Sequence, residues 1–212
     1  MICVSLANMN FKECLKAIEK EHFVEIRLDK MSFNKEQVSK IFSQPVKLIA
    51  TCRPGKYSSS KRMELLKKAI DVGANYVDLE IEGTADYLME LTDYAHNSKT
   101  KVIYSYHNFD ETPDIEELIK ITRMCFDHGA DLAKVVTMVK SNVDRARILS
   151  LYGLFKNIVA FGMGDKGKLT RILAPLMGAE FTYACREQGN EVAPGQIDKA
   201  SLLEKIELLR DI

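Results

Sequence analysis

The sequence lacks the features that mark secreted, disulfide-linked or membrane-embedded proteins. Its start, MICVSLANMNF, has no basic segment and no long apolar run, so it does not resemble a signal peptide. It contains no run of ~18 apolar residues, so we expect no membrane-spanning helix. The cysteines form no C-x-x-C pair, which argues against a disulfide framework or a structural zinc site and favours a reducing, cytoplasmic compartment. The five are Cys3, Cys14, Cys52, Cys125 and Cys185.

The sequence also lacks a net charge. Thirty basic residues balance thirty acidic residues, so the charge gives no reason to expect a nucleic acid or an anionic membrane as a partner. The hydrophobic fraction of 46% is ordinary for a globular enzyme. With 212 residues, the chain is long enough for one sizeable core and close to the lower limit for an eight-fold barrel.

Short β-branched runs alternate regularly with amphipathic helical patterns along the whole chain. The clearest helical patterns cover residues 63–73, 116–129 and 202–209, and the second of them stops at Gly129. The eight candidate strands cover residues 2–7, 23–29, 47–53, 76–82, 101–108, 132–139, 158–163 and 181–185.

Eight strands, each followed by a helix, predict an α/β fold. We expect a single-domain (β/α)₈ barrel of the TIM type, with residues 1–212 forming one catalytic domain. A doubly wound open sheet is the alternative. Eight regular units without a Gly-rich phosphate loop favour the closed barrel.

Polar residues recur on one face of five consecutive candidate strands. In FVEIRLD, for example, Glu25 and Arg27 share the face opposite to Val24 and Ile26. The outer face of a barrel strand packs under helices and must be apolar, so the polar face points inward. The alternative is a buried ion-pair network that merely fills the barrel. The inward polar residues are then Glu25, Arg27, Arg53, Asp78, Glu80, His107 and Lys134.

One of the four histidines stands apart. His22, His96 and His128 lie near the ends of helical patterns, where a surface position is expected. His107 ends a strand on the inward face that it shares with Ser105. A strand histidine is often only a core residue, but a strand end next to Glu80 favours catalysis, since a carboxylate can hold an imidazole in one tautomer.

Lys134 lies in a β-branched strand, LAKVVTMV, where lysine is rare. An edge-strand lysine that reaches solvent is a serious alternative, although a closed barrel has no edge. A buried amine beside Arg27 and Arg53 would lose its proton more readily and so act as a Schiff-base nucleophile. The same arginines would favour an anionic substrate.

Two later loops carry further candidate residues. The turn GMGDKGKLTR (162–171) enters a helix that carries Arg171, and such a turn can bind an anion through backbone N–H groups. The segment REQGNEVAPGQ (186–196) follows the last strand and ends at Gln196. It is either a lid over the site or a plain surface turn.

Seven motifs occur together in a recognisable order and spacing: EIRLD (25–29), TCR (51–53), DLE (78–80), SYHNF (105–109), ADLAK (130–134), MGDKGKLTR (163–171) and APGQ (193–196). Over nearly the whole chain the sequence resembles the type I 3-dehydroquinate dehydratases. That family folds as a (β/α)₈ barrel and converts 3-dehydroquinate to 3-dehydroshikimate with loss of water, in the shikimate pathway of aromatic amino acid biosynthesis. The resemblance also implies a homodimer that needs no metal or coenzyme.

The resemblance implies a role for each candidate residue. Lys134 would form an imine with the substrate ketone, and His107 would abstract the α-proton and later protonate the departing hydroxyl. Glu80 would orient His107, and Arg171 would bind the substrate carboxylate. The other residues implied to bind the substrate are Ser5, Glu25, Arg27, Arg53 and Gln196.

Val192 departs from the family pattern, because it stands directly before APGQ where a serine is usual. This departure gives some weight to a barrel that binds a ligand without turning it over. Another Schiff-base barrel enzyme, such as an aldolase acting on a phosphorylated sugar acid, is the remaining alternative.

Overall fold

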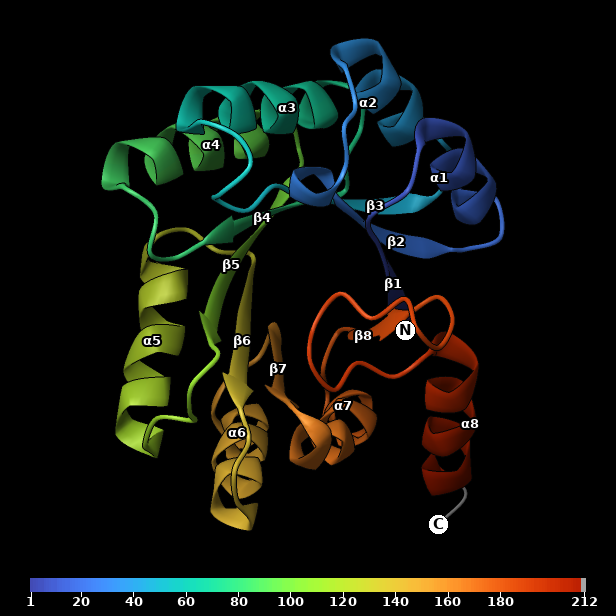
Figure 1. The fold of residues 1–212 in the computed structure, drawn as a ribbon. Coiled ribbons are helices and arrows are strands. Elements are labelled where there is room, and N and C mark those ends of the chain that lie inside the picture. The colour runs from blue at the N-terminus through green and yellow to red at the C-terminus, as the bar shows by residue number, and fades with distance from the viewer. Residues whose placement is uncertain (211–212) are drawn as a thin grey trace.

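The computed structural model describes residues 1–210, so the last two residues of the predicted 1–212 domain lie outside the described residues. Figure 1 looks onto a ring of strands with helices around it. Each of the eight predicted strands is confirmed, with ends within two residues of the predicted range. The strands are β1 (Ile2–Leu6), β2 (Phe23–Arg27), β3 (Lys47–Thr51), β4 (Tyr76–Glu80), β5 (Lys101–Asn108), β6 (Leu132–Met138), β7 (Ile158–Met163) and β8 (Thr182–Cys185).

A helix follows every strand. Three of the helices begin at capping boxes, in which Asn10, Asn34 or Ser141 exchanges hydrogen bonds with the third residue of its helix. The predicted helices at 63–73, 116–129 and 202–209 correspond to α3, α5 and α8. The helices are α1 (Phe11–Ile18), α2 (Lys35–Phe42), α3 (Ser59–Asp71), α4 (Ala85–Asn97), α5 (Ile115–Asp127), α6 (Asn142–Leu154), α7 (Lys168–Leu173) and α8 (Lys199–Arg210), and short 3₁₀ turns lie at Leu28–Lys30, Asp165–Gly167 and Ala174–Leu176.

The strands are parallel and run in the order β7-β6-β5-β4-β3-β2-β1-β8. This order follows the chain around a barrel and excludes the doubly wound alternative, in which the strand order reverses at a switch point. Within residues 1–210 no ladder of hydrogen bonds joins β7 to β8. Side chains bridge this seam instead, with the rings of Phe161 and Tyr183 5.9 Å apart. The barrel prediction is confirmed, and its closure at β7–β8 is through packing.

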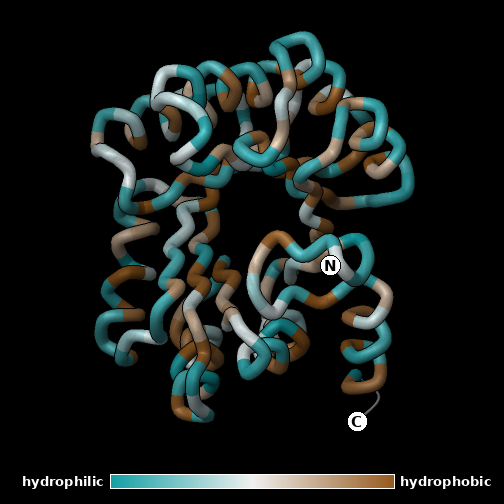
Figure 2. The backbone as a smooth tube through the Cα atoms, viewed as in Figure 1, coloured by the Kyte–Doolittle hydropathy of each residue, from teal (hydrophilic) through white to brown (hydrophobic). Residues whose placement is uncertain are grey.

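The alternation along the strands sorts residues into two layers, as predicted. Val24 and Ile26 pack outward against the buried faces of the helices. In Figure 2 these helices carry both hydrophobic and hydrophilic residues along their length. A second cluster fills the barrel interior. Its buried members are Cys3, Phe23, Ile49, Tyr76, Ile103, Leu132, Val136, Val159, Phe161, Met163, Phe181 and Tyr183.

The loops after β7 and β8 touch each other above the seam. The Gly164 amide donates a hydrogen bond to the Pro194 carbonyl at 3.2 Å. A Cβ on Gly195 would lie 2.3 Å from the Gly164 carbonyl oxygen, so only glycine permits this approach. The predicted lid segment is thereby fastened to the β7–α7 loop at its C-terminal end.

Candidate active site

One cavity of about 270 Å³ opens among the strand ends. All nine residues predicted to act on or bind a substrate line it, which supports the inward orientation of the polar face. The predicted residues in its wall are Ser5, Glu25, Arg27, Arg53, Glu80, His107, Lys134, Arg171 and Gln196. The wall also contains residues that the sequence did not single out for the site, among them Lys30, Phe109 and Tyr183.

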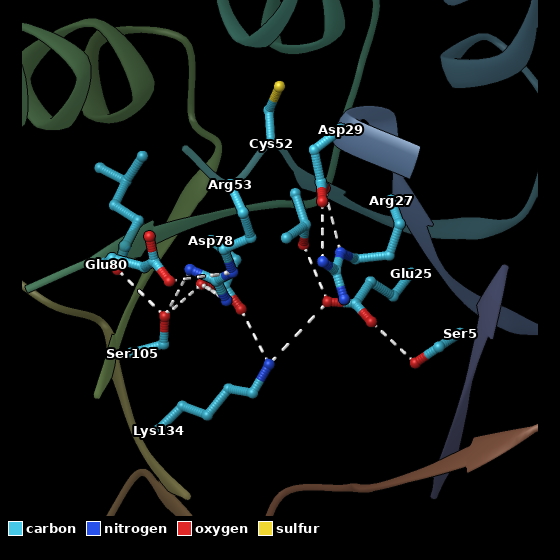
Figure 3. A network of polar contacts seen from close by, with 12 residues as sticks. Ser5, Glu25, Arg27, Asp29, Cys52, Arg53, Asp78, Glu80, Ser105 and Lys134 are labelled. Carbon is cyan, nitrogen blue, oxygen red and sulfur yellow. Dashed lines mark hydrogen bonds and ion pairs between the residues drawn. The ribbon is translucent and has the colours of Figure 1, made fainter. Parts of the chain in front are cut away.

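Lys134 on β6 is only 5% exposed. Its Nζ lies 3.0 Å from Asp78 Oδ2 and 3.9 Å from Glu25 Oε1, as the dashed lines in Figure 3 mark. It also lies 4.1 Å from the ring centre of Tyr183. Arg27 and Arg53, expected near the amine, line the same cavity, but neither is its direct partner. The guanidinium of Arg27 bonds Asp29, that of Arg53 bonds Asp78, and the groups in ion contact with the amine are carboxylates.

Glu25 on β2 is held from two sides. Ser5 Oγ donates to its Oε2 at 2.7 Å, and Thr51 Oγ1 donates to its Oε1 at 2.9 Å. The hydroxyls come from the neighbouring strands β1 and β3, so three adjacent strands fix one carboxylate. Hydrogen bonds of this kind reduce the cost of a buried negative charge.

Asp78 on β4 is the most enclosed carboxylate of the site, with a side chain that is 0% exposed. Arg53 Nη2 donates to its Oδ1 at 2.7 Å, and Ser105 Oγ donates to the same oxygen at 2.6 Å. Burial opposes ionisation of this carboxyl, but the cations of Arg53 and Lys134 outweigh burial and hold its pKa below the usual range. Asp78 is therefore an anion at neutral pH.

Arg53 is shared among three partners. Besides Asp78, its Nη1 donates to Ser105 Oγ at 2.9 Å, and its Nε lies 3.7 Å from Glu80 Oε1. Burial would lower the pKa of Arg53, but the surrounding carboxylates, Asp78 first, raise it. Asp78 and Ser105 were not among the predicted site residues. Their inward-facing positions on β4 and β5 are the sequence feature that could have identified them as site residues.

His107 on β5 lies nearer the cavity mouth than Lys134. In the β5–β6 register Ser105 pairs with Lys134, and His107 follows two residues later beside Val136. Burial lowers the pKa of His107 well below 6.5, and the cations of Arg53 and Lys134 lower it further. Its imidazole is therefore neutral at neutral pH, the form that can accept a proton.

The predicted contact between Glu80 and His107 is not present among the described residues. His107 Nδ1 is buried without a hydrogen-bond partner there, and the charged partner of Glu80 is Arg53 instead. The two residues line the same cavity. The ring of His107 stacks on Phe109, with centroids 6.2 Å apart and planes inclined by 18°. The described contact of the imidazole is thus a ring stacking, and the role of Glu80 in orienting His107 stays a prediction.

Arg171 on α7 is a buried cation without a counter-ion in residues 1–210. Its side chain is among the largest that are fully buried, at 1% exposed, and no ion pair of the described chain includes it. The guanidinium carbon lies 4.2 Å from the ring centre of Phe161, and Nε has no hydrogen-bond partner among those residues. Burial lowers the pKa of Arg171 to about 9, which leaves it charged at neutral pH. Such a cation in a cavity wall is suited to an anionic ligand group.

Gln196, at the end of the 186–196 segment, is 5% exposed. Its Oε1 accepts a hydrogen bond from the Val192 amide at 2.8 Å, and its Nε2 donates to Ser5 Oγ at 3.4 Å. The side chain therefore ties this segment to β1 across the cavity mouth. Whether the segment moves as a lid remains a prediction.

Residues 1–210 contain no group of three or more His, Cys, Asp or Glu side chains placed to hold a metal ion. In the same range no helix is both long and apolar enough to cross a membrane.

Comparisons with known proteins agree over nearly the full length of the chain. Residues 2–211 match the family described as type I 3-dehydroquinase. A protein of Methanococcus maripaludis called 3-dehydroquinate dehydratase is 36% identical, over 99% of this chain and 100% of its own length. One of the same name from Methanocaldococcus jannaschii is 36% identical over 96% of each chain.

Solved structures similar to this chain include further 3-dehydroquinate dehydratases. The 3-dehydroquinate dehydratase of Aquifex aeolicus matches with a TM-score of 0.83 and 29% identity, over 98% of each chain. A type I 3-dehydroquinate dehydratase of Clostridium difficile matches with a TM-score of 0.88, over 100% of this chain and 92% of that one. At 24% identity the latter supports the fold alone.

Proposed function

The chain belongs to the type I 3-dehydroquinase family, and on that premise we propose that it converts 3-dehydroquinate to 3-dehydroshikimate and water through an imine on Lys134. One observation carries this proposal. A buried amine, a neutral imidazole and a guanidinium without a counter-ion in residues 1–210 line the same cavity of about 270 Å³. These three groups match a substrate that has a ketone, an acidic α-proton and a carboxylate.

The first step is imine formation. The ammonium of Lys134 and the substrate ketone combine to give an iminium and one water, so the nitrogen carries one positive charge before and after the step. Within the step the amine gives up a proton to attack the carbonyl carbon, and the carbonyl oxygen leaves as water. The iminium withdraws electrons, which makes the neighbouring C–H acidic.

His107 is suited to the proton transfers that follow. Its neutral imidazole takes the α-proton, and the C–H electron pair moves toward the iminium to form an enamine. The enamine then expels the β-hydroxyl, which takes the proton from the imidazolium and leaves as water. This sequence regenerates both an iminium and a neutral imidazole, and hydrolysis of the iminium releases the product.

Arg171 provides the anchor for the substrate. An anionic carboxylate would supply the counter-ion that the guanidinium lacks among the described residues, and would so pair a buried charge that otherwise destabilises the fold. Ser5, Glu25, Arg27, Arg53 and Gln196 line the same cavity with donors and acceptors suited to ring hydroxyls.

Ultraviolet absorption tests the proposal, because the product is a conjugated enone and the substrate is not. Purified chain mixed with 3-dehydroquinate should develop this absorption at a rate proportional to enzyme concentration. A product with a cleaved carbon–carbon bond would instead indicate an aldolase. Tight binding without any product would indicate a barrel that has become a binding module.

We also propose that the chain acts as a cytoplasmic homodimer within aromatic amino acid biosynthesis, as the family resemblance implies. Sedimentation equilibrium of the purified chain tests the dimer, and a mass of 24.0 kDa, that of one chain, would contradict it.

A further inference from the structure

We propose that Asp78 is a positioning residue for Lys134: its carboxylate, anchored by Ser105 and Arg53, aims the amine at the cavity and remains as the fixed counter-charge of the nitrogen. The inference rests on the proposed function and adds to it a residue that does not line the cavity.

The two oxygens of Asp78 have separate partners. Oδ1 accepts hydrogen bonds from Arg53 Nη2 at 2.7 Å and from Ser105 Oγ at 2.6 Å. Oδ2 accepts the hydrogen bond from Lys134 Nζ at 3.0 Å. One oxygen therefore fixes the carboxylate to the barrel, and the other fixes the amine to the carboxylate (Figure 3).

The anchor is rigid because its parts belong to three neighbouring strands or strand ends. Arg53 lies two residues beyond the end of β3, Asp78 lies on β4, and Ser105 lies on β5. Asp78 and Ser105 are 2% and 0% exposed, so water does not compete for these bonds. A lysine side chain has several rotatable bonds, and such an anchor reduces the number of positions that Nζ can take.

Glu25 is the other carboxylate near the amine, and it fits this role less well. Its Oε1 lies 3.9 Å from Nζ, and the carboxylate lines the cavity, where it can contact substrate. Asp78 is closer to Nζ and lies behind the cavity wall. Asp78 is therefore placed to act on the substrate through the two cavity residues that it holds, Lys134 directly at Nζ and Arg53 in the wall.

The chemistry of imine formation suits a fixed counter-charge. The nitrogen is cationic as an ammonium and again as an iminium, and the overall charge is unchanged when water is released. A pre-placed anion at 3.0 Å therefore stabilises both cationic forms without moving. Because both cations are stabilised alike, the anion does not favour one of them over the other. Its replacement by a neutral amide weakens the anchor that holds Nζ toward the cavity, so formation of the iminium, on which both α-proton removal and hydroxyl loss depend, should slow.

A double-mutant cycle tests the proposal with Asp78→Asn, Ser105→Ala and the double variant. Enone formation gives kcat and KM, and borohydride reduction followed by mass spectrometry gives the rate of covalent adduct formation. We expect kcat to fall about 10² to 10³-fold in Asp78→Asn, with KM changed less than about threefold and adduct formation slowed in parallel. Ser105→Ala should lower kcat about 5- to 20-fold, and the double variant should resemble Asp78→Asn, because Ser105 acts through Asp78.

Asp144→Asn is the matched control. Asp144 is a buried carboxylate, 8% exposed, that accepts hydrogen bonds from the Lys140 and Ser141 amides at the start of α6, outside the site. This variant should melt at a lower temperature while its kcat stays within about twofold. The control separates the general effect of losing a buried carboxylate from the specific effect of losing that of Asp78.

The outcomes distinguish failure of the role proposed for Asp78 from failure of the proposed function. If the unmodified chain makes enone and adduct, then near-normal kcat in Asp78→Asn, or Ser105 and Asp78 effects that multiply in the double variant, overturns the role of Asp78 alone. If the unmodified chain makes neither, the proposed function fails, and the role of Asp78 fails with it. Should Asp78→Asn not fold, Ser105→Ala decides, and an unchanged kcat in that variant overturns the proposal.

Discussion

Inside the barrel, inward-facing residues two positions apart on the same strand form two levels, which we call lower and upper. On each of six consecutive strands an apolar residue at the lower level is followed, two positions later, by a polar residue at the upper level. The lower residues are Cys3, Phe23, Ile49, Tyr76, Ile103 and Leu132, and the upper ones are Ser5, Glu25, Thr51, Asp78, Ser105 and Lys134. Both levels are buried, so the difference between them lies in chemistry and not in access to water.

The lower level is held by aromatic packing. Phe23 meets Phe181 edge to face at 4.8 Å, and both rings lie 6.0 Å from Tyr76. The upper level consists of charges that are stable only as a connected set, because each buried charge needs a partner. We infer that the lower level supplies stability and the upper level supplies reactivity. The variants below test this division.

Removal of the amine should have the largest effect on activity. In Lys134→Met the side chain keeps a similar length but cannot form an imine, so kcat should fall at least about 10⁴-fold. Asp78 and Glu25 retain their other hydrogen-bond partners, so the variant should still fold, as circular dichroism can verify. Lys120→Met, on the exposed surface of α5, is the control. A loss of less than tenfold would contradict the role of Lys134.

Removal of the imidazole should come next. His107→Gln should lower kcat about 10² to 10⁴-fold, the usual range for a positioned acid–base group, whereas the exposed His96→Gln should not. The unmodified enzyme should also have a characteristic pH profile. Because the pKa of His107 is depressed, the base form persists as pH falls, and the acidic limb of kcat/KM should lie below pH 6.5. An acidic limb above that value would mean that the imidazole is not the base.

A variant of the lower level should lose stability and keep its activity. Phe23→Ala removes a ring that packs against two others and should lower the free energy of unfolding by about 3 to 5 kcal/mol. The kcat and KM of the folded fraction should remain within about threefold of normal. Urea unfolding and enone assays at low temperature measure the two quantities. A large fall in kcat without loss of stability would break the division between the levels.

Arg171 should affect binding without stabilising the fold. Arg171→Gln should raise KM about 10- to 150-fold, the range for a hydrogen bond to a charged group. The free energy of unfolding should stay the same or rise, because the guanidinium is buried and has no anion beside it in residues 1–210. Arg123→Gln, on the exposed face of α5, should change neither quantity. A marked loss of stability in Arg171→Gln would show that this residue supports the fold instead.

The smallest effect is expected at the cavity mouth. Val192 lines the cavity where family members usually carry a serine. Val192→Ser should lower KM about two- to tenfold if the added hydroxyl bonds the substrate or the segment above it. Val143→Ser, on the exposed surface of α6, provides the comparison. An unchanged KM would mean that the hydroxyl has no partner here.

The sequence predicted the faces of the strands better than the contacts between them. Alternation alone placed Glu25, Lys134 and His107 inside the barrel, because side-chain direction in a strand depends only on position along it. Contacts depend also on how neighbouring strands are staggered. Asp78 is level with Thr51 in the sheet, yet it bonds Arg53, two residues further on. No single strand contains that information.

The same limit applies to the direct partners of two site residues. Glu80 was predicted to orient His107, and its carboxylate lies beside Arg53. The amine of Lys134 was expected near Arg27 and Arg53, and its direct partners are the carboxylates of Asp78 and Glu25. In both cases the residues reach the predicted cavity, and the choice of partner depends on side-chain conformation that the alternation does not determine.

The central claim is that Lys134 forms a covalent bond with the substrate, and reductive trapping tests it most directly. The chain is treated with borohydride in the presence of 3-dehydroquinate, digested and analysed by mass spectrometry. The account predicts added substrate-derived mass on the peptide that contains Lys134, which is absent when 3-dehydroquinate is omitted. Full enone formation without any adduct at Lys134 would contradict it.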